Sequence, residues 1–253
     1  MARFPEKSTK QRLDQLLVER GLAESRTRAQ ALVLAGKVFS DDRRLDKPGL
    51  SLAADAPLTL KGSDHPWVSR GGVKLAHALE HFAIDPAGRI CLDVGASTGG
   101  FTDVLLSRGA ARVYAVDVGR GQLDWKLRND DRVVVLERTN ARRLVRGHVP
   151  EEVDILVCDA SFIGLSTILP APMALAAPGA FLVALIKPQF EVGKRRVGKG
   201  GVVRDAALHR EVCAGIEAWL AAQSGWLVLG LTESPLTGPS GNKEFLIAAR
   251  CAD

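Results

Sequence analysis

A glycine-rich turn between two carboxylates is the part of this 253-residue sequence whose residue types and spacing most directly suggest chemistry. Glycines let a backbone approach a ligand closely, and a carboxylate that ends the following strand can accept hydrogen bonds from a ribose diol. The pattern predicts a nucleotide-type cofactor site and favours S-adenosylmethionine. The predicted cofactor-binding residues are Asp93, Gly95, Ala96, Ser97, Thr98, Gly99, Gly100, Phe101, Asp117, Val118 and Asp159.

Other kinds of site share parts of the sequence pattern. Gly95-x-Ser97-x-Gly99 matches a hydrolase nucleophile elbow, but the turn follows the first strand of its domain and no oxyanion glycine loop precedes it. The spacing also departs from the G-x-G-x-x-G of dinucleotide sites. Gly193 to Lys199 resembles a P-loop without the hydroxyl that binds magnesium. His77 and His81 have zinc-protease spacing, but Lys74 shares their helix face, so we predict no metal site.

Four charged residues follow or precede predicted structural elements at positions where α/β sheets usually place function. Asp159 and Lys187 each end a buried strand, and Glu244 opens the final strand. Lys74 lies on a helix that begins after Ser69-Arg70-Gly71-Gly72. Each of the four alone is compatible with a surface ion pair. Together with the glycine turn, they form a candidate catalytic set.

The elements that must position these residues alternate along the chain. Apolar runs predict strands at 90–94, 112–116, 132–136, 153–158 and 180–186, with two more near 226–231 and 244–249. Helical periodicity predicts a helix from Asp205 to Ser224. Alternating strands and helices indicate a parallel sheet with helices on both faces. The uncharged stretch 160–186 is interrupted by prolines and glycines, which favours a helix, a loop and a buried strand over a membrane span.

Charge is concentrated at the start of the chain. The formal net charge is +5, and residues 1–62 hold 12 basic and 8 acidic groups, which leaves the rest almost neutral. This distribution suggests a polyanion-binding module, residues 1–62, joined by a linker at 63–69 to a larger domain at 70–253. The four scattered cysteines and the absence of an apolar leader predict a cytoplasmic protein.

The small module has a recognisable pattern. Arg12-Leu13-Asp14-x-x-Leu17, Ser25-Arg26-x-x-Ala29 and Gly36-Lys37-Val38 resemble the ribosomal protein S4 type of RNA-binding domain. The resemblance implies docking on structured RNA through shape and backbone contacts. A second basic segment, the glycine-rich residues 193–204, adjoins Lys187. The RNA-binding candidates are Arg12, Arg20, Arg26, Arg28, Lys37, Lys194, Arg195, Arg196 and Lys199.

Nearly the whole chain resembles the TlyA family of rRNA 2′-O-methyltransferases, which are related to the FtsJ-type ribose methyltransferases. The motifs that carry the resemblance are residues 69–75, Gly95–Phe101, Asp117–Gly119, Asp159–Ile163, Lys187–Lys194 and Gly238–Asn242. The resemblance implies a Rossmann-like, seven-stranded and mostly parallel α/β sheet with helices on both faces, plus the small α+β RNA-binding domain. It also implies S-adenosylmethionine as cofactor, ribosomal RNA or ribosomal subunits as partner, and a monomer.

The family's catalytic tetrad falls on Lys74, Asp159, Lys187 and Glu244. A ribose hydroxyl is a poor acid, so its proton must leave as the oxygen attacks the methyl group. We expect Lys187 to act as base or to orient the oxygen, with Lys74 lowering its pKa. Asp159 would fix Lys187, and Glu244 would orient Lys74 or the ribose.

Two departures bear on the substrate. The family's inter-domain Arg-x-Trp-Val is His65-Pro66-Trp67-Val68 here, and the chain ends soon after its last predicted strand. The second feature resembles the shorter subtype and favours a cytidine in large-subunit rRNA, with the small subunit as a further possible substrate. Two alternatives stay open: a haemolysin-like, membrane-active protein, and a non-catalytic RNA-binding factor for ribosome assembly.

Overall fold

The protein is represented by a computed structural model that describes residues 10–20, 22–23, 25–60, 65–238 and 240–253, apart from the side chain of Lys194. The chain divides into two compact units, residues 1–66 and 67–253. Of the predicted linker at 63–69, residues 63 and 64 lie outside the described residues, whereas residues 67–69 belong to the larger unit.

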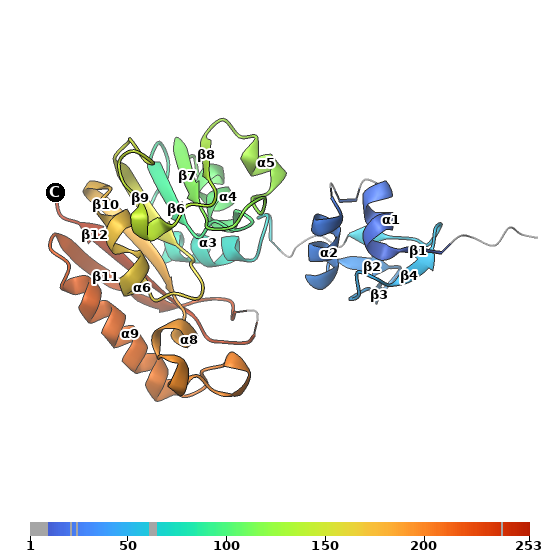
Figure 1. Ribbon diagram of the computed structural model, residues 1–253. Helices are drawn as coiled ribbons and strands as arrows, with labels where there is room; N and C mark the ends of the chain where they lie inside the picture. Colours follow the sequence, from blue (N-terminus) through green and yellow to red (C-terminus); the bar gives the residue numbers. More distant parts are fainter. Residues whose placement is uncertain (1–9, 21, 24, 61–64, 239) are drawn as a thin grey trace, which may run out of the picture. The chain divides into compact units, whose positions relative to one another are not determined.

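The smaller unit consists of two helices and two small sheets (Figure 1). Helix α1 is Leu13–Glu19 and α2 is Arg26–Leu34, and Ser25 Oγ accepts a hydrogen bond from the Arg28 backbone N–H at 3.2 Å to begin α2. The strands form two antiparallel sets: β1 (Lys10–Arg12) with β4 (Ser51–Ala53), and β2 (Val38–Ser40) between β3 (Arg43–Arg44) and β5 (Thr59–Leu60). Apolar residues from both helices and from β2 form its core, including Leu13, Leu17, Ala29, Val33 and Val38.

The larger unit is built on a seven-stranded sheet in the order β11-β12-β10-β9-β6-β7-β8 (Figure 1). The strands are β6 (Ile90–Val94), β7 (Arg112–Val116), β8 (Val133–Leu136), β9 (Val153–Cys158), β10 (Ala176–Ile186), β11 (Trp226–Glu233) and β12 (Phe245–Cys251). All neighbouring pairs are parallel except the two that β12 makes with β10 and β11. The predicted mostly parallel, seven-stranded fold is therefore confirmed.

Helices cover both faces of the sheet because alternate strand residues point to opposite sides. Leu92, Leu156 and Leu182 belong to one apolar cluster, which includes side chains of α6 (Leu165–Ile168), α7 (Pro170–Met173) and α9 (Ala206–Ala221). The intervening residues Cys91, Ile155 and Val183 belong to a second cluster with α3 (Gly71–His81), α4 (Gly100–Ser107) and α5 (Trp125–Arg128). The remaining short helices are α8 (Pro188–Glu191) and single 3₁₀ turns at 141–143, 194–196 and 199–201.

Strand direction brings the candidate residues to one edge of the sheet. The carboxyl ends of the parallel strands β6, β7, β9 and β10 lie at the same edge, so the glycine turn, Asp117, Asp159 and Lys187 all emerge there. Strand β12 runs the other way, and its Phe245 pairs with Ile186 at the end of β10. Glu244, the residue before β12, is thereby delivered beside Lys187.

The long uncharged stretch 160–186 contains α6, α7 and β10, as its proline and glycine content predicted. Strand β10 begins at Ala176, four residues earlier than expected from the sequence. Within the described parts of the chain, every helix falls short of the length and apolarity that crossing a bilayer would require.

Candidate active site

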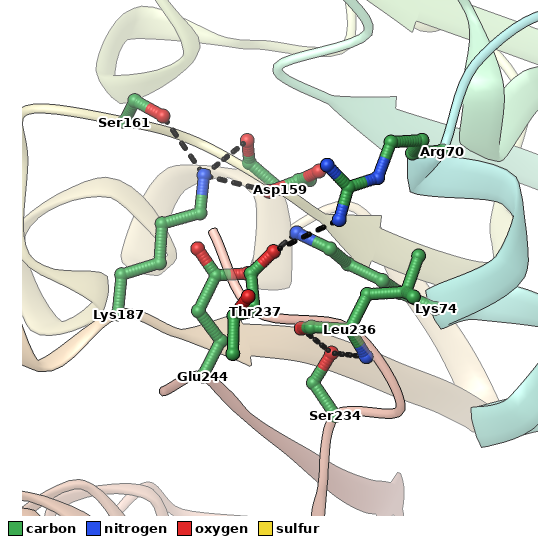
Figure 2. A network of polar contacts seen from close by, with 9 residues as sticks. All are labelled: Arg70, Lys74, Asp159, Ser161, Lys187, Ser234, Leu236, Thr237 and Glu244. Carbon is green, nitrogen blue, oxygen red and sulfur yellow. Dashed lines mark hydrogen bonds and ion pairs between the residues drawn. The ribbon is translucent and has the colours of Figure 1, made fainter. Parts of the chain in front are cut away.

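Two lysine–carboxylate pairs lie at the carboxyl edge of the sheet (Figure 2). Lys74 Nζ lies 2.5 Å from Glu244 Oε2, and Lys187 Nζ lies 2.7 Å from Asp159 Oδ1. The Lys74, Lys187 and Glu244 side chains are at most 10% exposed, and Asp159 is 22% exposed. The structure therefore brings together all four residues of the predicted set, as one ion pair between Lys74 and Glu244 and another between Lys187 and Asp159.

Lys187 is the most fully contacted of the four. Besides the Asp159 carboxylate, its Nζ donates to Ser161 Oγ at 2.8 Å and to the Asp159 backbone carbonyl at 3.3 Å. The contact with Asp159 Oδ1 is close but lacks hydrogen-bond geometry, so it is an ion pair only. An ammonium group has three donors and no acceptor, and here three oxygens surround it. Ser161 is not among the site residues predicted from the sequence, although it lies in the motif Asp159-Ala160-Ser161.

Lys74 and Glu244 come from distant parts of the chain. Lys74 lies on the first turns of α3, and Glu244 follows a turn in which Gly238 N–H donates to the Asn242 carbonyl at 2.9 Å. A side chain at Gly238 would place its Cβ 2.5 Å from Glu244 Oε1, so glycine is needed there to leave room for the carboxylate. Arg70, at the start of α3, donates to the Thr237 carbonyl at 3.4 Å (Figure 2). These contacts tie α3 to the segment that carries Glu244.

The glycine turn after β6 has the geometry of a ligand cradle. Gly95 and Gly99 have φ angles of 85° and 93°, which residues with a side chain rarely adopt. A Cβ at Gly95 would lie 3.1 Å from the Ala160 backbone, so only glycine allows the turn to pass so close to the end of β9. The helix α4 that follows begins at Gly100, and its N-terminal end lies at this edge of the sheet.

Asp93 and Asp117, two of the acidic residues of the predicted cofactor site, have different roles. Asp93 is fully buried, and its Oδ2 accepts hydrogen bonds from Thr102 N–H at 3.0 Å and from Thr102 Oγ1 at 2.7 Å. Its Oδ1 is buried without a partner among the described residues. Burial is the main reason that the pKa of Asp93 rises to about 7. Asp117 accepts from Ser97 N–H at 2.8 Å and from Gly119 N–H at 2.6 Å, which fixes the glycine turn against the end of β7.

A small pocket opens beside Asp117. It is lined by Ala96, Ser97, Ala115, Asp117, Gly119, Gln122, Leu123, Val135 and Glu137. Six of these residues were not among the predicted cofactor-binding residues: Ala115, Gly119, Gln122, Leu123, Val135 and Glu137. Val118, which was predicted to bind the cofactor, is 71% exposed next to this pocket.

The chemistry of these groups fits S-adenosylmethionine. A buried carboxylate oxygen without a partner can accept a hydrogen bond from an amino group, and each oxygen of Asp117 keeps an unused lone pair for a ribose hydroxyl. The apolar lining residues suit the flat base of a nucleoside.

Comparison with known proteins agrees with this geometry. Residues 67–251 match the FtsJ-like methyltransferase family, and residues 11–55 match the S4 domain. The 16S/23S rRNA (cytidine-2′-O)-methyltransferase TlyA of Mycobacterium tuberculosis is 53% identical over 94% of this chain and 89% of its own length. The chain belongs to the TlyA family of FtsJ-like methyltransferases. It is therefore an S-adenosylmethionine-dependent methyltransferase with an S4-type RNA-binding domain.

Two further relatives of this TlyA-family chain are informative. The 23S rRNA (cytidine-2′-O)-methyltransferase TlyA of Campylobacter jejuni is 36% identical over 71% of this chain and 69% of its own length. A solved structure from Streptococcus thermophilus, described provisionally as a hemolysin, is 43% identical with a TM-score of 0.75, and the match covers 98% of this chain and 90% of that one.

In the S4 domain, two of the predicted RNA-binding arginines also bind a buried carboxylate. Arg12 and Arg26 each lie 2.9 Å from Asp14 Oδ2, and Gln30 donates to the same oxygen at 2.9 Å. The Arg12 guanidinium is the main reason that the pKa of Asp14 lies well below its usual range. Both arginines keep about half of their side chains exposed, at 43% and 53%, so they can hold this carboxylate and still face a ligand.

Arg20 is used differently from the other S4-domain candidates, because it donates to the backbone carbonyls of Ala54 and Ala56. It therefore holds the segment between β4 and β5. Arg28 and Lys37 are half-buried and remain candidates for an RNA contact.

The basic loop of this family member, residues 193–204, is also partly committed to internal contacts. Arg196 makes a two-pronged ion pair with Glu211 of α9, with distances of 2.5 and 2.6 Å. The loop itself contains no acidic residue, so the partner of Arg196 comes from α9, which follows the loop in the sequence. Arg195 and Lys199 are exposed, and the side chain of Lys194 lies outside the described residues.

An aromatic pair beside Lys187 was not predicted as part of the site. Phe162 is 90% exposed with a φ of 67°, and its ring centroid lies 5.1 Å from that of Phe190. Both residues lie inside motifs that carry the family resemblance, so the signal was present in the sequence. An exposed aromatic ring in a strained backbone conformation next to catalytic candidates indicates a functional position.

Proposed function

We propose that this protein transfers a methyl group from S-adenosylmethionine to the 2′-hydroxyl of a cytidine in ribosomal RNA. The observation that carries the proposal is the pairing of Lys74 with Glu244 and of Lys187 with Asp159 at the edge of the sheet that also holds the glycine turn. The S4 domain supports RNA as the substrate, and the activity printed for the two TlyA relatives supports the nucleotide and the position on it.

The chain's own residues must orient the ribose and take its proton. Bound S-adenosylmethionine supplies an activated, electrophilic methyl group, so alignment accounts for much of the acceleration. Lys187 is surrounded by three oxygens and, as an ammonium, has no lone pair with which to accept a proton. To act as base it must first pass a proton to Asp159 or to solvent. In its charged form it orients the 2′-oxygen instead.

The second pair holds the site together. Lys74 is almost buried and is neutralised by Glu244, so burial of its charge is tolerated. Because each lysine has its own carboxylate, we assign Lys74 a positioning role across from Lys187 rather than the direct tuning role expected from the sequence. Glu244 keeps one carboxylate oxygen, Oε1, for a ribose hydroxyl.

The choice of ribosomal subunit is a finer part of the proposal. The relative that is 36% identical is named for 23S rRNA. The relative that is 53% identical is named for both 16S and 23S rRNA. We therefore propose that both subunits are substrates, with the large subunit as the principal one.

The decisive experiment measures transfer of labelled methyl from S-adenosylmethionine to purified small subunits, large subunits and intact ribosomes that lack the modification. We expect labelled cytidine 2′-O-methyl in the rRNA, mapped to single nucleotides. Transfer to none of the three particles, by protein that binds the cofactor, would refute the proposal and leave an RNA-binding assembly factor.

A Lys187 variant provides the internal control. Lys187→Met keeps the length of the side chain but removes its charge, and we expect methyl transfer to fall by about a hundredfold or more, as for a residue at the reacting atoms. The dissociation constant for S-adenosylmethionine should stay within about twofold, because Lys187 lies outside the glycine turn. Near-normal transfer by this variant would show that Lys187 neither accepts the proton nor orients the oxygen.

A further inference from the structure

The C-terminal end of the basic loop is clamped by two side chains. Asn242 Oδ1 accepts a hydrogen bond from Val203 N–H at 2.9 Å, and Asn242 Nδ2 donates to the Gly201 carbonyl at 2.9 Å. His209 Nε2 lies 2.9 Å from the Val203 carbonyl, which requires that this nitrogen carry the proton. Both polar atoms of the Asn242 amide and both backbone groups of Val203 are thus used.

The clamp is buried although the loop is not. Asn242 is 2% exposed, Val203 is 3% exposed and His209 is 7% exposed, and the His209 ring packs against Phe245 with centroids 5.6 Å apart. By contrast, residues 198–201 are all exposed. A buried amide with a complete set of partners specifies one arrangement of its surroundings, because breaking any of these bonds leaves a buried polar group unpaired.

Both ends of the basic loop are connected to catalytic residues, the C-terminal end through the clamp and the N-terminal end through α8. Asn242 stands two residues before Glu244, and its own carbonyl closes the turn at Gly238 that makes room for the Glu244 carboxylate. At the other end, the loop begins two residues after α8, whose first residue follows Lys187 directly. The basic loop therefore spans from one ion pair of the active site to the other.

We propose that Asn242 is a positioning residue for methyl transfer, which holds the basic loop over the active site so that RNA phosphates bound by Arg195 and Lys199 keep the ribose in register with Lys187 and Glu244. This inference rests on the proposed function, since it assumes an RNA substrate. Among the described side chains of this loop, Arg195, Lys199 and Arg204 are exposed, whereas Arg196 is held by Glu211. Arg195 and Lys199 lie in the part of the loop that precedes the clamped Val203, so we assign the phosphate contacts to them.

The test is a double-mutant cycle on affinity for purified large ribosomal subunits, measured over a salt series. In the otherwise unchanged protein, removing both loop charges (Arg195→Ala with Lys199→Ala) should weaken binding about tenfold and lower the slope of log K against log salt by about 1 per contact. In an Asn242→Ala background, the same double change should alter affinity by less than about twofold. Independent, multiplying effects of the two changes would overturn the proposal.

Kinetics separate positioning from a general loss of structure. For Asn242→Ala we expect the KM for ribosomal subunits to rise about tenfold, while the dissociation constant for S-adenosylmethionine stays within about twofold. Asn129→Ala is the matched control, because this exposed asparagine also donates to a backbone carbonyl, that of Trp125, but contacts no part of the site. An equal loss of cofactor and RNA binding in Asn242→Ala would contradict the assignment.

His209 gives a second route if Asn242→Ala does not fold. His209→Gln keeps an N–H donor within reach of the Val203 carbonyl, so its KM for ribosomal subunits should stay near that of the native protein. His209→Phe fills the space without a donor, so its KM should rise as in Asn242→Ala. Equal behaviour of the two His209 variants would overturn the clamp. Subunit binding is measured independently of methyl transfer. If the native protein binds subunits but transfers no methyl group, the proposed function is refuted, and the binding cycle still decides whether Asn242 positions the loop.

Discussion

Asp93 is the residue whose environment differs most from that of the same side chain in water. It is fully buried, it has one oxygen without a partner among the described residues, and its pKa is raised to about 7. An aspartate in an unfolded chain has a pKa near 4. Folding without cofactor therefore takes up a proton between about pH 4 and pH 7, and the stability that Asp93 contributes falls as the pH rises through that window.

We predict that Asp93→Asn removes this pH dependence. In unfolding of the cofactor-free protein by denaturant, the free energy of unfolding of the native sequence minus that of Asp93→Asn should be highest near pH 4 and should decline by about a few kcal/mol up to about pH 7. The comparison uses the difference between the two proteins because other groups also titrate over this range. A difference that is flat with pH would show that Asp93 is ionised throughout.

Among the elements, the central strands were predictable from the sequence. Strands β6, β7 and β9 have the predicted bounds, because each is mostly apolar with at most one charged residue, as is typical of strands buried between helices. The short strands β1, β3 and β4 were not predicted, since Lys10–Arg12 and Arg43–Arg44 are wholly polar and show no alternation. Their strand geometry comes from partners elsewhere in the chain, which a local pattern does not contain.

The same contrast between local pattern and distant partners applies to the side chains of the site. The positions of Asp159, Lys187 and Glu244 at strand ends could be predicted, because strand ends are visible as the limits of apolar runs. The pairing of Asp159 with Lys187 and of Glu244 with Lys74 was expected from the family resemblance, but the local sequence pattern does not contain it, because Lys74 and Glu244 are 170 residues apart and the antiparallel course of β12 brings them together. Nor does the local pattern contain the contacts of Ser161 and Asn242 or the pair between Arg196 and Glu211.

Helices α1 and α2 are joined through Asp14, and this contact gives a second prediction. Asp14→Asn keeps the shape of the side chain but removes the charge that Arg12 and Arg26 share, so we expect the S4 unit to lose about 2 kcal/mol. Calorimetry of the full chain should show a lower transition for this unit and an unchanged one for the larger unit. Equal shifts of both transitions, or of neither, would contradict this.

The same contact predicts how acid affects the S4 unit. Because the pKa of Asp14 is lowered on folding, its contribution is complete above about pH 4 and is lost as the pH falls further. The Asn variant should therefore lose less stability than the native sequence when the pH is lowered below 4.

At the scale of the whole molecule, we expect the S4 unit to contribute to RNA affinity without contributing to cofactor affinity. We predict that Lys37→Glu, in the S4 unit, raises the KM for ribosomal subunits about tenfold and lowers the salt slope of binding by about 1. The dissociation constant for S-adenosylmethionine and kcat at saturating RNA should not change. Arg89→Glu, at the end of β6 opposite the site, is the control and should leave all of these values unchanged. A fall in kcat with unchanged KM would place Lys37 outside RNA docking.

The antiparallel strand β12 also has a consequence for biosynthesis. It lies between β10 and β11, yet it is made after both, so the sheet has a gap until the last residues of β12 leave the ribosome. Glu244 and Asn242 arrive together with that strand. A nascent or prematurely terminated chain without β12 would thus lack an interior strand, an ion-pair partner for Lys74 and the anchor of the basic loop at once. Only a completed chain can modify RNA, and interrupted products would present an unpaired β10 edge to proteases.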